Sequence, residues 1–358
     1  MLTIIIFIVI LGLLIFVHEF GHFLVAKKNG VKVEEFGFGF PPRIFGIKKG
    51  ETVYSINLIP LGGFVKIFGE EGEAKENHRS FAAKKIWQRA IILLAGVAMN
   101  VFLAAIVVSL GYGLGLPTAI DDSQMVSGAK VQITEIAPNS PAQIAGLKSG
   151  DIVVKILAEE ELNNIGKVNE VQNFIAKNKG EEIVMTLQRG RDVREVKVVP
   201  RINPPVGEGA LGVDLARVTN VFYPWYQAIY EGVKTTFILI WTITVALGYL
   251  FWQLVSQGRA PGAEVAGPVG IFSLTGQAAQ MGFVYLLQLT ALLSINLAII
   301  NALPLPALDG GRVLFLIIEK IKGSPVSQRI ERAIHSAGFV FLIILMLLIT
   351  VRDVIKLF

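Results

Sequence analysis

Three residues near the N-terminus, His18, Glu19 and His22, have the types and spacing of a metal-dependent hydrolase site. On a helix, positions i and i+4 share one face, so the two histidines can direct a ring nitrogen at the same metal ion. Glu19 then lies beside the metal, where its carboxylate can take a proton from water. The alternative is a polar stripe that faces other helices. The chain has 4 histidines, and two of them at ligand spacing favour the metal site.

The surroundings of this HEFGH motif are apolar. Residues 1–25 contain no other ionisable side chain and are long enough to cross a bilayer as a helix of roughly 20 residues. An unpaired carboxylate at that depth costs about 2.5–3.5 kcal/mol, and metal binding accounts for its presence. The segment lacks the basic start and small-residue cleavage site of a signal peptide, so we expect it to remain in the protein.

A second motif, NALPLPALDGG, occupies residues 301–311. Pro304 and Pro306 break a helix, and the glycine pair allows close backbone approach before a new helix over 312–322. Asp309 is the carboxylate at this break, and broken helices at membrane depth face protein or a polar cavity. We expect Asp309 to join the two histidines as a third ligand, which leaves a fourth position for water. The alternative is that Asp309 only caps the following helix.

The composition indicates a multi-pass membrane protein. Of 358 residues, 53% are hydrophobic, which leaves room for one small soluble domain. The absence of cysteine excludes disulfides and thiolate ligands. The net charge of +5 is modest, and the basic residues report topology rather than a nucleic-acid surface.

We predict a multi-pass α-helical membrane protein with about four transmembrane helices, an inserted PDZ-like α/β domain and a membrane-associated β-hairpin region. The N-terminal membrane part covers 1–116, the PDZ-like domain 126–203, a linker with an interfacial or partly inserted helix 204–268, and the C-terminal membrane part 269–358. Residues 237–255 are apolar enough to span the membrane. A full crossing there would place Asp309 and its motif on the opposite side of the membrane from HEFGH.

The distribution of lysine and arginine predicts the orientation. The loop after the first span is rich in basic residues, so we place it in the cytoplasm. Both termini and the PDZ-like domain then lie outside, and the HEFGH motif lies toward the cytoplasmic side. His78 and His335 match no ligand pattern.

The cytoplasmic loop and the second span contain further signals. Residues 36–40 and 54–59 predict short strands, whose edge either pairs with an unwound substrate segment or only plugs the helix bundle. In the second span, Gly96 permits close approach to the first helix and Asn100 can hydrogen-bond across, a pattern that favours packing over chemistry.

The middle of the chain resembles a PDZ domain. Residues 137–151, APNSPAQIAGLKSGD, match the signature of bacterial PDZ domains, and four strand-like runs surround them at 131–136, 151–156, 182–187 and 195–199. Two helices are expected at 140–145 and 168–178. Such domains bind extended peptides by strand addition. Whether this one binds peptide or acts as a size filter stays open at this point.

The two motifs, with a PDZ-like domain between them, resemble the site-2 protease family of intramembrane zinc metalloproteases, in the branch of the bacterial regulator of sigma-E protease. The chain departs from that regulator in having a single PDZ-like domain and an unusually apolar 237–255.

The resemblance implies one zinc ion per chain, held by His18, His22 and Asp309, with Glu19 as the general base. It also implies that Asn301, with Pro304 and Pro306, positions the substrate strand or stabilises the oxyanion. Substrates would be transmembrane segments of single-pass proteins, such as anti-sigma factors or signal-peptide remnants, in the bacterial cytoplasmic membrane. No nucleic-acid partner is expected.

Two other functions fit parts of the sequence. A membrane zinc peptidase that trims peptides from solution would use the same ligands. A non-catalytic PDZ-bearing scaffold would need a structural metal site, but such sites normally have four protein ligands and only three are found here.

Overall fold

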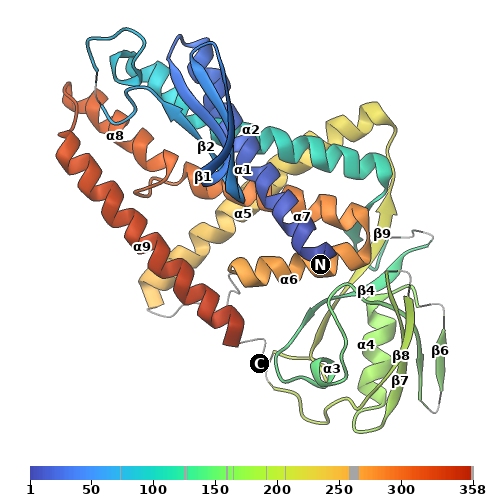
Figure 1. The fold of residues 1–358 in the computed structure, drawn as a ribbon. Helices are drawn as coiled ribbons and strands as arrows, with labels where there is room; N and C mark the ends of the chain where they lie inside the picture. Colours follow the sequence, from blue (N-terminus) through green and yellow to red (C-terminus); the bar gives the residue numbers. More distant parts are fainter. Residues whose placement is uncertain are drawn as a thin grey trace. The chain divides into compact units, whose positions relative to one another are not determined.

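The computed structural model describes residues 1–355 except 73, 125, 127, 159, 164, 191, 206 and 258–265. The chain forms two compact units (Figure 1). The helical unit comprises Met1–Leu110, Ile229–Thr275 and Gln288–Phe358, and the sheet unit comprises Gly111–Ala228 and Gly276–Leu287.

Long apolar helices dominate the chain. Over the described ranges, five helices are long and apolar enough to cross a membrane: α1 (Leu2–Lys28), α2 (Ile86–Leu114), α5 (Trp225–Gln257), α7 (Phe283–Ala302) and α9 (Gln328–Ile355). Four of them correspond to the predicted spans. The fifth, α5, includes the predicted 237–255 segment within a single helix of 33 residues. Two shorter helices follow α5 and α7, namely α6 (Pro268–Met281) and α8 (Asp309–Lys322).

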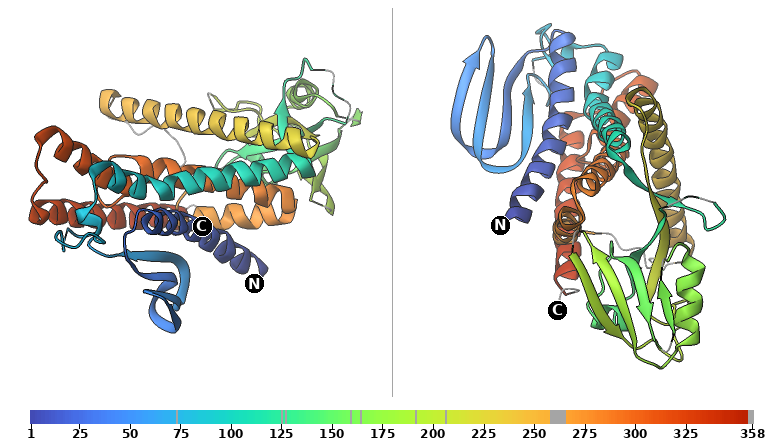
Figure 2. Two further views of the ribbon diagram at one scale, coloured as in Figure 1. Left: turned by 90° about the horizontal axis from the view of Figure 1, so that it is seen from above. Right: turned by 90° about the vertical axis from the view of Figure 1, so that its right-hand side faces the viewer.

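The strands predicted in the loop after the first span form a long hairpin beside α1, as Figure 2 shows. Strand β1 (Val33–Lys49) pairs antiparallel with β2 (Thr52–Ile67). Residues 35–38 of β1 pair both with 53–56 and with 63–66 of β2. The hairpin is therefore bent back on itself, and the start of β1 lies between two parts of β2. Among the described strands none pairs with the far side of 63–66, so this segment is a sheet edge.

A buried cluster joins the end of α1 and the base of the hairpin to α2 and α8. The short helix η1 (Phe81–Ala83) contributes one aromatic ring to it. The buried members are Ala26, Val31, Val33, Ile67, Phe81, Ile92, Leu93 and Leu316. This packing fixes the helix that carries the HEFGH motif relative to the helix that begins at Asp309, although the two motifs are far apart in the chain.

The sheet unit is a mixed α/β structure. Its strands are β3 (Leu116–Ile120), β4 (Lys130–Ile136), β5 (Ile152–Leu157), β6 (Glu161–Asn163), β7 (Ile183–Arg189), β8 (Asp192–Val198) and β9 (Val213–Val221). They pair in the order β3-β9-β4-β5-β7-β8, with β6 on β5, and every pairing is antiparallel. Helices α3 (Pro141–Ile144) and α4 (Val168–Lys177) lie where the sequence predicted them.

Two strands of the sheet unit, β3 and β9, fall outside the predicted domain 126–203. β9 lies in the stretch 204–268, which the sequence indicated as a linker and an interfacial helix, yet it pairs with both β3 and β4. Proline and glycine before it, Pro204, Pro205 and Gly207, suggest a linker locally. Only its two partners, which are distant in sequence, make the following residues a strand.

The signature loop of the sheet unit is held by a buried ion pair. The Asp151 carboxylate is completely buried and accepts two hydrogen bonds from the Arg189 guanidinium, at 2.6 and 2.7 Å. It also accepts one from the backbone N–H of Lys148, at 2.9 Å. The hydrogen bonds to Asp151 raise the pKa of Arg189, although partial burial opposes this. The predicted Gly-Asp end of the signature is therefore a structural element of this unit.

Candidate metal centre

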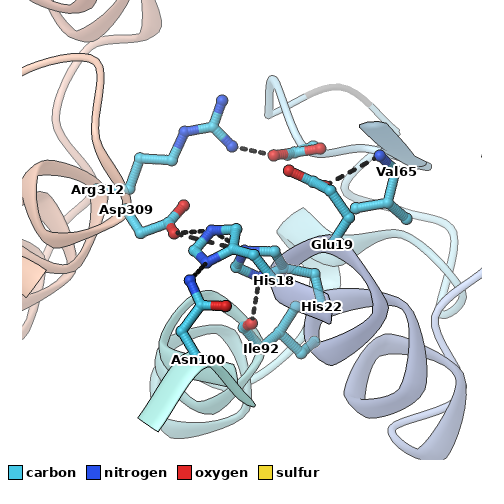
Figure 3. A network of polar contacts seen from close by, with 9 residues as sticks. His18, Glu19, His22, Val65, Ile92, Asn100, Asp309 and Arg312 are labelled. Carbon is cyan, nitrogen blue, oxygen red and sulfur yellow. Dashed lines mark hydrogen bonds and ion pairs between the residues drawn. The ribbon is translucent and has the colours of Figure 1, made fainter. Parts of the chain in front are cut away.

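Side chains from the two predicted motifs meet in the helical unit (Figure 3). The Nε2 atom of His18 lies 3.0 Å from Oδ2 of Asp309 and 3.1 Å from Nε2 of His22. The His22 Nε2 atom is 3.4 Å from the same carboxylate oxygen. The two motifs are 291 residues apart, so this convergence is a property of the tertiary fold.

The separations suit a zinc ion. Zinc binds histidine nitrogen and carboxylate oxygen at about 2.0–2.2 Å, which places tetrahedral ligand atoms about 3.4 Å from one another. The three candidate ligand atoms approach that spacing. Three protein ligands, with a fourth position left for water, are the pattern of catalytic rather than structural zinc.

Helix α2 supports both histidines. Gly96 lies directly beneath the two imidazoles, and a Cβ atom there would stand 2.7 Å from Cε1 of His18 and would collide with His22 Nε2. The Nδ1 atom of His22 is 2.8 Å from the backbone oxygen of Ile92, one turn earlier on α2. The close approach predicted for Gly96 is confirmed, because only a residue without a side chain leaves room for the rings.

Glu19 lies beside the ligand set without belonging to it. One oxygen of its carboxylate accepts a hydrogen bond from the backbone N–H of Val65, at 3.1 Å. Val65 lies on the free edge of β2, and Figure 3 shows the carboxylate next to the histidines. The site thus includes a carboxylate close to the candidate ligands that is not itself one of them.

Asp309 is the first residue of α8, which begins three residues earlier than the predicted 312–322 helix. The residue that precedes it, Leu308, is the helix cap and makes no side-chain cap bond. The Asp309 carboxylate instead contacts the histidines. Gly310 packs so closely on the carbonyl oxygens at the end of α7 that a Cβ there would clash, which explains the glycine after the aspartate.

The predicted substrate-binding residues flank this break. Asn301 is in the last turn of α7, and Pro304 and Pro306 lie in the connection to α8. Pro304 is exposed, whereas Pro306 packs beneath Gly338 of α9, where a Cβ would lie 2.9 Å from the Pro306 carbonyl oxygen. In the described structure, the polar network around the histidines does not include these three residues.

Two polar contacts near the site escaped sequence reasoning. His335 Nδ1 accepts a hydrogen bond from the backbone N–H of Ala307, at 2.9 Å, and so holds the turn that precedes Asp309. Ala307 has a left-handed backbone, with φ of +73°, which an alanine adopts only when its surroundings hold it there. His335 is a lone histidine in an apolar segment, and nothing in its local sequence indicates this partner.

The second is the ion pair between Arg312, one turn after Asp309, and Glu70, in the loop after β2. Both residues line a cavity of about 340 Å³ beside α8 and α9. Other charged side chains on its wall are Glu71, Lys75, Arg89, Glu319, Glu331 and Arg332. The pair joins the loop after the hairpin to the helix that carries the aspartate.

Comparison with known proteins identifies the family. Residues 6–345 match Peptidase family M50. The chain belongs to this family. The zinc metalloprotease RasP of Geobacillus kaustophilus is 34% identical, over 99% of this chain and 98% of that protein. The regulator of sigma-W protease RasP of Bacillus subtilis is 30% identical, over 99% of each chain.

The resemblance to site-2 proteases is thus confirmed. This M50 peptidase is an intramembrane zinc metalloprotease of regulated intramembrane proteolysis, and its cofactor is zinc. It is a bacterial inner-membrane protein whose substrates are membrane-bound. When bound, zinc polarises the scissile carbonyl and makes water nucleophilic at neutral pH.

Proposed function

We propose that His18, His22 and Asp309 hold the catalytic zinc and that Glu19 is the general base for hydrolysis of peptide bonds within transmembrane segments. The observation that carries this assignment is the convergence of the three ligand atoms beside the Glu19 carboxylate. In this assignment Glu19 takes a proton from the attacking water and later gives it to the leaving amine. The burial of both histidines keeps bulk water from competing for their ring nitrogens.

The substrate enters as an added strand on the edge of β2. A peptide bond in a transmembrane helix is shielded by its own hydrogen bonds, so the helix must unwind before attack, and its freed backbone groups need new partners. Val65 directs its N–H away from β1 toward Glu19. Because alternate residues of a strand face the same neighbour, Gly63 offers its backbone groups on that same side. An extended substrate paired there would pass directly beside the candidate metal ligands.

Substrates of this kind include anti-sigma factors and signal-peptide remnants with one transmembrane segment. Support comes from the relative in Bacillus subtilis, whose name is regulator of sigma-W protease. The sheet unit, which carries the PDZ-like signature, is proposed to lie outside and either to bind an extended segment or to exclude bulky proteins. Asn301 and the two following prolines are assigned to substrate positioning, because they precede the candidate ligand Asp309 in the broken segment.

The number of crossings rests on parity, and the side of each loop rests on the basic residues after α1. Asp309 and His18 must lie at the same depth, since their side chains touch. Helix α6 has 14 residues, or about 21 Å, and is too short to cross a hydrocarbon core of about 30 Å. We therefore assign α5 to the interface or to a partial crossing, which leaves four full spans, both termini outside and the site toward the cytoplasm.

The test measures bound zinc and cleavage together. Wild type, Glu19→Gln and Asp309→Ala are purified and compared for zinc content and for cutting of a single-pass model substrate. Wild type should hold about one zinc ion and cut inside the apolar segment. Glu19→Gln should keep zinc and lose activity by about 10²–10⁴-fold, whereas Asp309→Ala should lose zinc.

The other outcomes are equally informative. Cleavage that survives Glu19→Gln would assign the base elsewhere. Cleavage only of peptides added from solution would favour a membrane peptidase of that kind, and zinc without cleavage of any substrate by wild type would favour a scaffold.

A further inference from the structure

The two candidate histidine ligands differ in how their second ring nitrogen is held. A neutral imidazole that binds metal through Nε2 carries its proton on Nδ1, and an acceptor for that proton fixes the tautomer and the ring plane. For His22 the partner is the backbone oxygen of Ile92, at 2.8 Å. For His18 the partner is a side chain, the amide of Asn100, at 3.3 Å.

Asn100 is completely buried on α2, one turn after Gly96. Its Nδ2 faces His18 Nδ1, and its Oδ1 is buried with no hydrogen-bond partner among the described residues. A buried acceptor without a partner is costly, so this amide oxygen needs an explanation. A half-turn of the amide exchanges the two atoms: it places Oδ1 opposite Nδ1 of His18 and moves Nδ2 into the position that Oδ1 held.

The backbone of Asn100 is fixed in place. Its carbonyl oxygen accepts a hydrogen bond from the hydroxyl of Ser294 on α7, at 2.8 Å, and both residues are fully buried. Gly96 brings the imidazoles against α2, so the short Asn100 side chain can reach His18. The Asn100 amide can therefore rotate about the Cβ–Cγ bond while the side chain stays in contact with the His18 imidazole.

We propose that Asn100 is a positioning residue for the zinc site, whose Oδ1 accepts the hydrogen bond from His18 Nδ1–H and so directs the Nε2 lone pair of His18 at the metal. The proposal rests on the ligand assignment made above. It goes beyond the packing role that the sequence favours for Asn100, because packing alone requires the shape of the side chain and not an acceptor at this position.

The asymmetry between the histidines has a consequence. A backbone carbonyl supports His22, and no substitution of Ile92 removes that atom. The support of His18 depends on one side chain. Groups that orient metal-binding histidines typically change metal affinity by about 10–100-fold when they are removed.

The experiment compares zinc affinity in Asn100→Leu and Asn100→Asp by competition with a chelator in the purified full-length protein. Leucine preserves volume but has no acceptor, and aspartate offers an oxygen whether ionised or protonated. We expect Leu to weaken zinc binding by about 10–100-fold and Asp to restore most of that loss. The control is Ser109→Ala, which removes a side-chain hydrogen bond to a backbone oxygen elsewhere on α2 and should leave zinc affinity unchanged.

Thermal unfolding of each variant in the presence of chelator shows whether it is folded. Wild-type zinc affinity in folded Asn100→Leu overturns the proposal. Equal weakening of zinc binding in the folded Leu and Asp variants also overturns it, because either result means that zinc affinity does not depend on an acceptor at this position. If Leu does not fold, nitrogen NMR of ¹⁵N-histidine in the zinc-loaded wild type decides. A proton on Nε2 of His18, with Nδ1 on the metal, would refute the proposal.

His22→Ala is measured alongside to separate this inference from the ligand assignment. Loss of zinc in His22→Ala together with normal affinity in Asn100→Leu rejects only the role of Asn100. Retention of zinc in His22→Ala rejects the ligand assignment itself.

Discussion

Replacement of Gly96 by alanine sets local helix preference against the tertiary contact. Alanine is favoured over glycine inside a helix by about 0.8–1.0 kcal/mol, so propensity alone predicts that Gly96→Ala stabilises α2. In the structure the new methyl group would lie 2.7 Å from Cε1 and 2.8 Å from Nε2 of His18, and it would clash with His22. Favourable carbon contacts are about 3.5–4.0 Å, so the imidazoles must move.

The magnitude follows from the cost of overpacking, about 1–3 kcal/mol for one extra methyl group in a filled site. Movement of the rings relieves this strain but displaces both candidate ligand atoms. If zinc must restore the original ring positions, its affinity falls by about 5- to 150-fold. At limiting zinc, cleavage should fall in the same proportion, because the fraction of protein molecules that hold zinc falls with the affinity.

The assay is zinc affinity of the purified protein by chelator competition, with cleavage of a single-pass substrate at limiting zinc as a second readout. Gly113→Ala is the matched control, since Gly113 is on the same helix and a Cβ there would meet nothing within 4 Å in the described structure. It should bind zinc as wild type does. Equal zinc affinity in Gly96→Ala and wild type would refute the view that the two imidazoles need the space that Gly96 leaves on α2.

Further predictions concern the substrate edge, the sheet unit and the turn before Asp309. Val65→Pro removes the outward N–H, which donates to the Glu19 carboxylate on the proposed substrate edge, while sparing the hydrogen bonds between β1 and β2. We expect kcat/KM to fall about tenfold, with Val65→Ala near wild type; equal activity of both variants would exclude a role for this N–H in holding Glu19 or in pairing with substrate. Asp151→Ala leaves the Arg189 charge unpaired and should lower the unfolding free energy of the sheet unit by about 3–5 kcal/mol, measured by hydrogen exchange in the whole protein. Asp192→Ala, which breaks only an exposed pair, should cost less than about 1 kcal/mol, and similar losses in both variants would contradict this reasoning. His335→Phe removes the acceptor for the Ala307 N–H and should weaken zinc binding with little change in stability. Unchanged zinc affinity would show that the turn before Asp309 keeps its conformation without this hydrogen bond.

The sheet unit shows why domain limits were harder to predict than secondary structure. The strands that alternate or are rich in branched residues, such as β4 and β7, appear where the local pattern placed them. β9 was missed because Pro204 and Gly207 precede it and signal a linker. Strand identity depends on hydrogen-bond partners, and the partners of β9 begin almost one hundred residues earlier in the chain.

Around the metal centre, too, local features could be predicted from the sequence and long-range contacts could not. The sequence alone determined the apolar helices, the shared face of His18 and His22, and the chemical need for one more carboxylate, because helix periodicity and desolvation are local. The tertiary structure decided which groups orient those ligands: the Ile92 carbonyl, the Asn100 amide and the bent edge of β2 that meets Glu19. These contacts join helices and strands far apart in the chain, so only packing brings them together, and no local pattern encodes a backbone carbonyl as a partner.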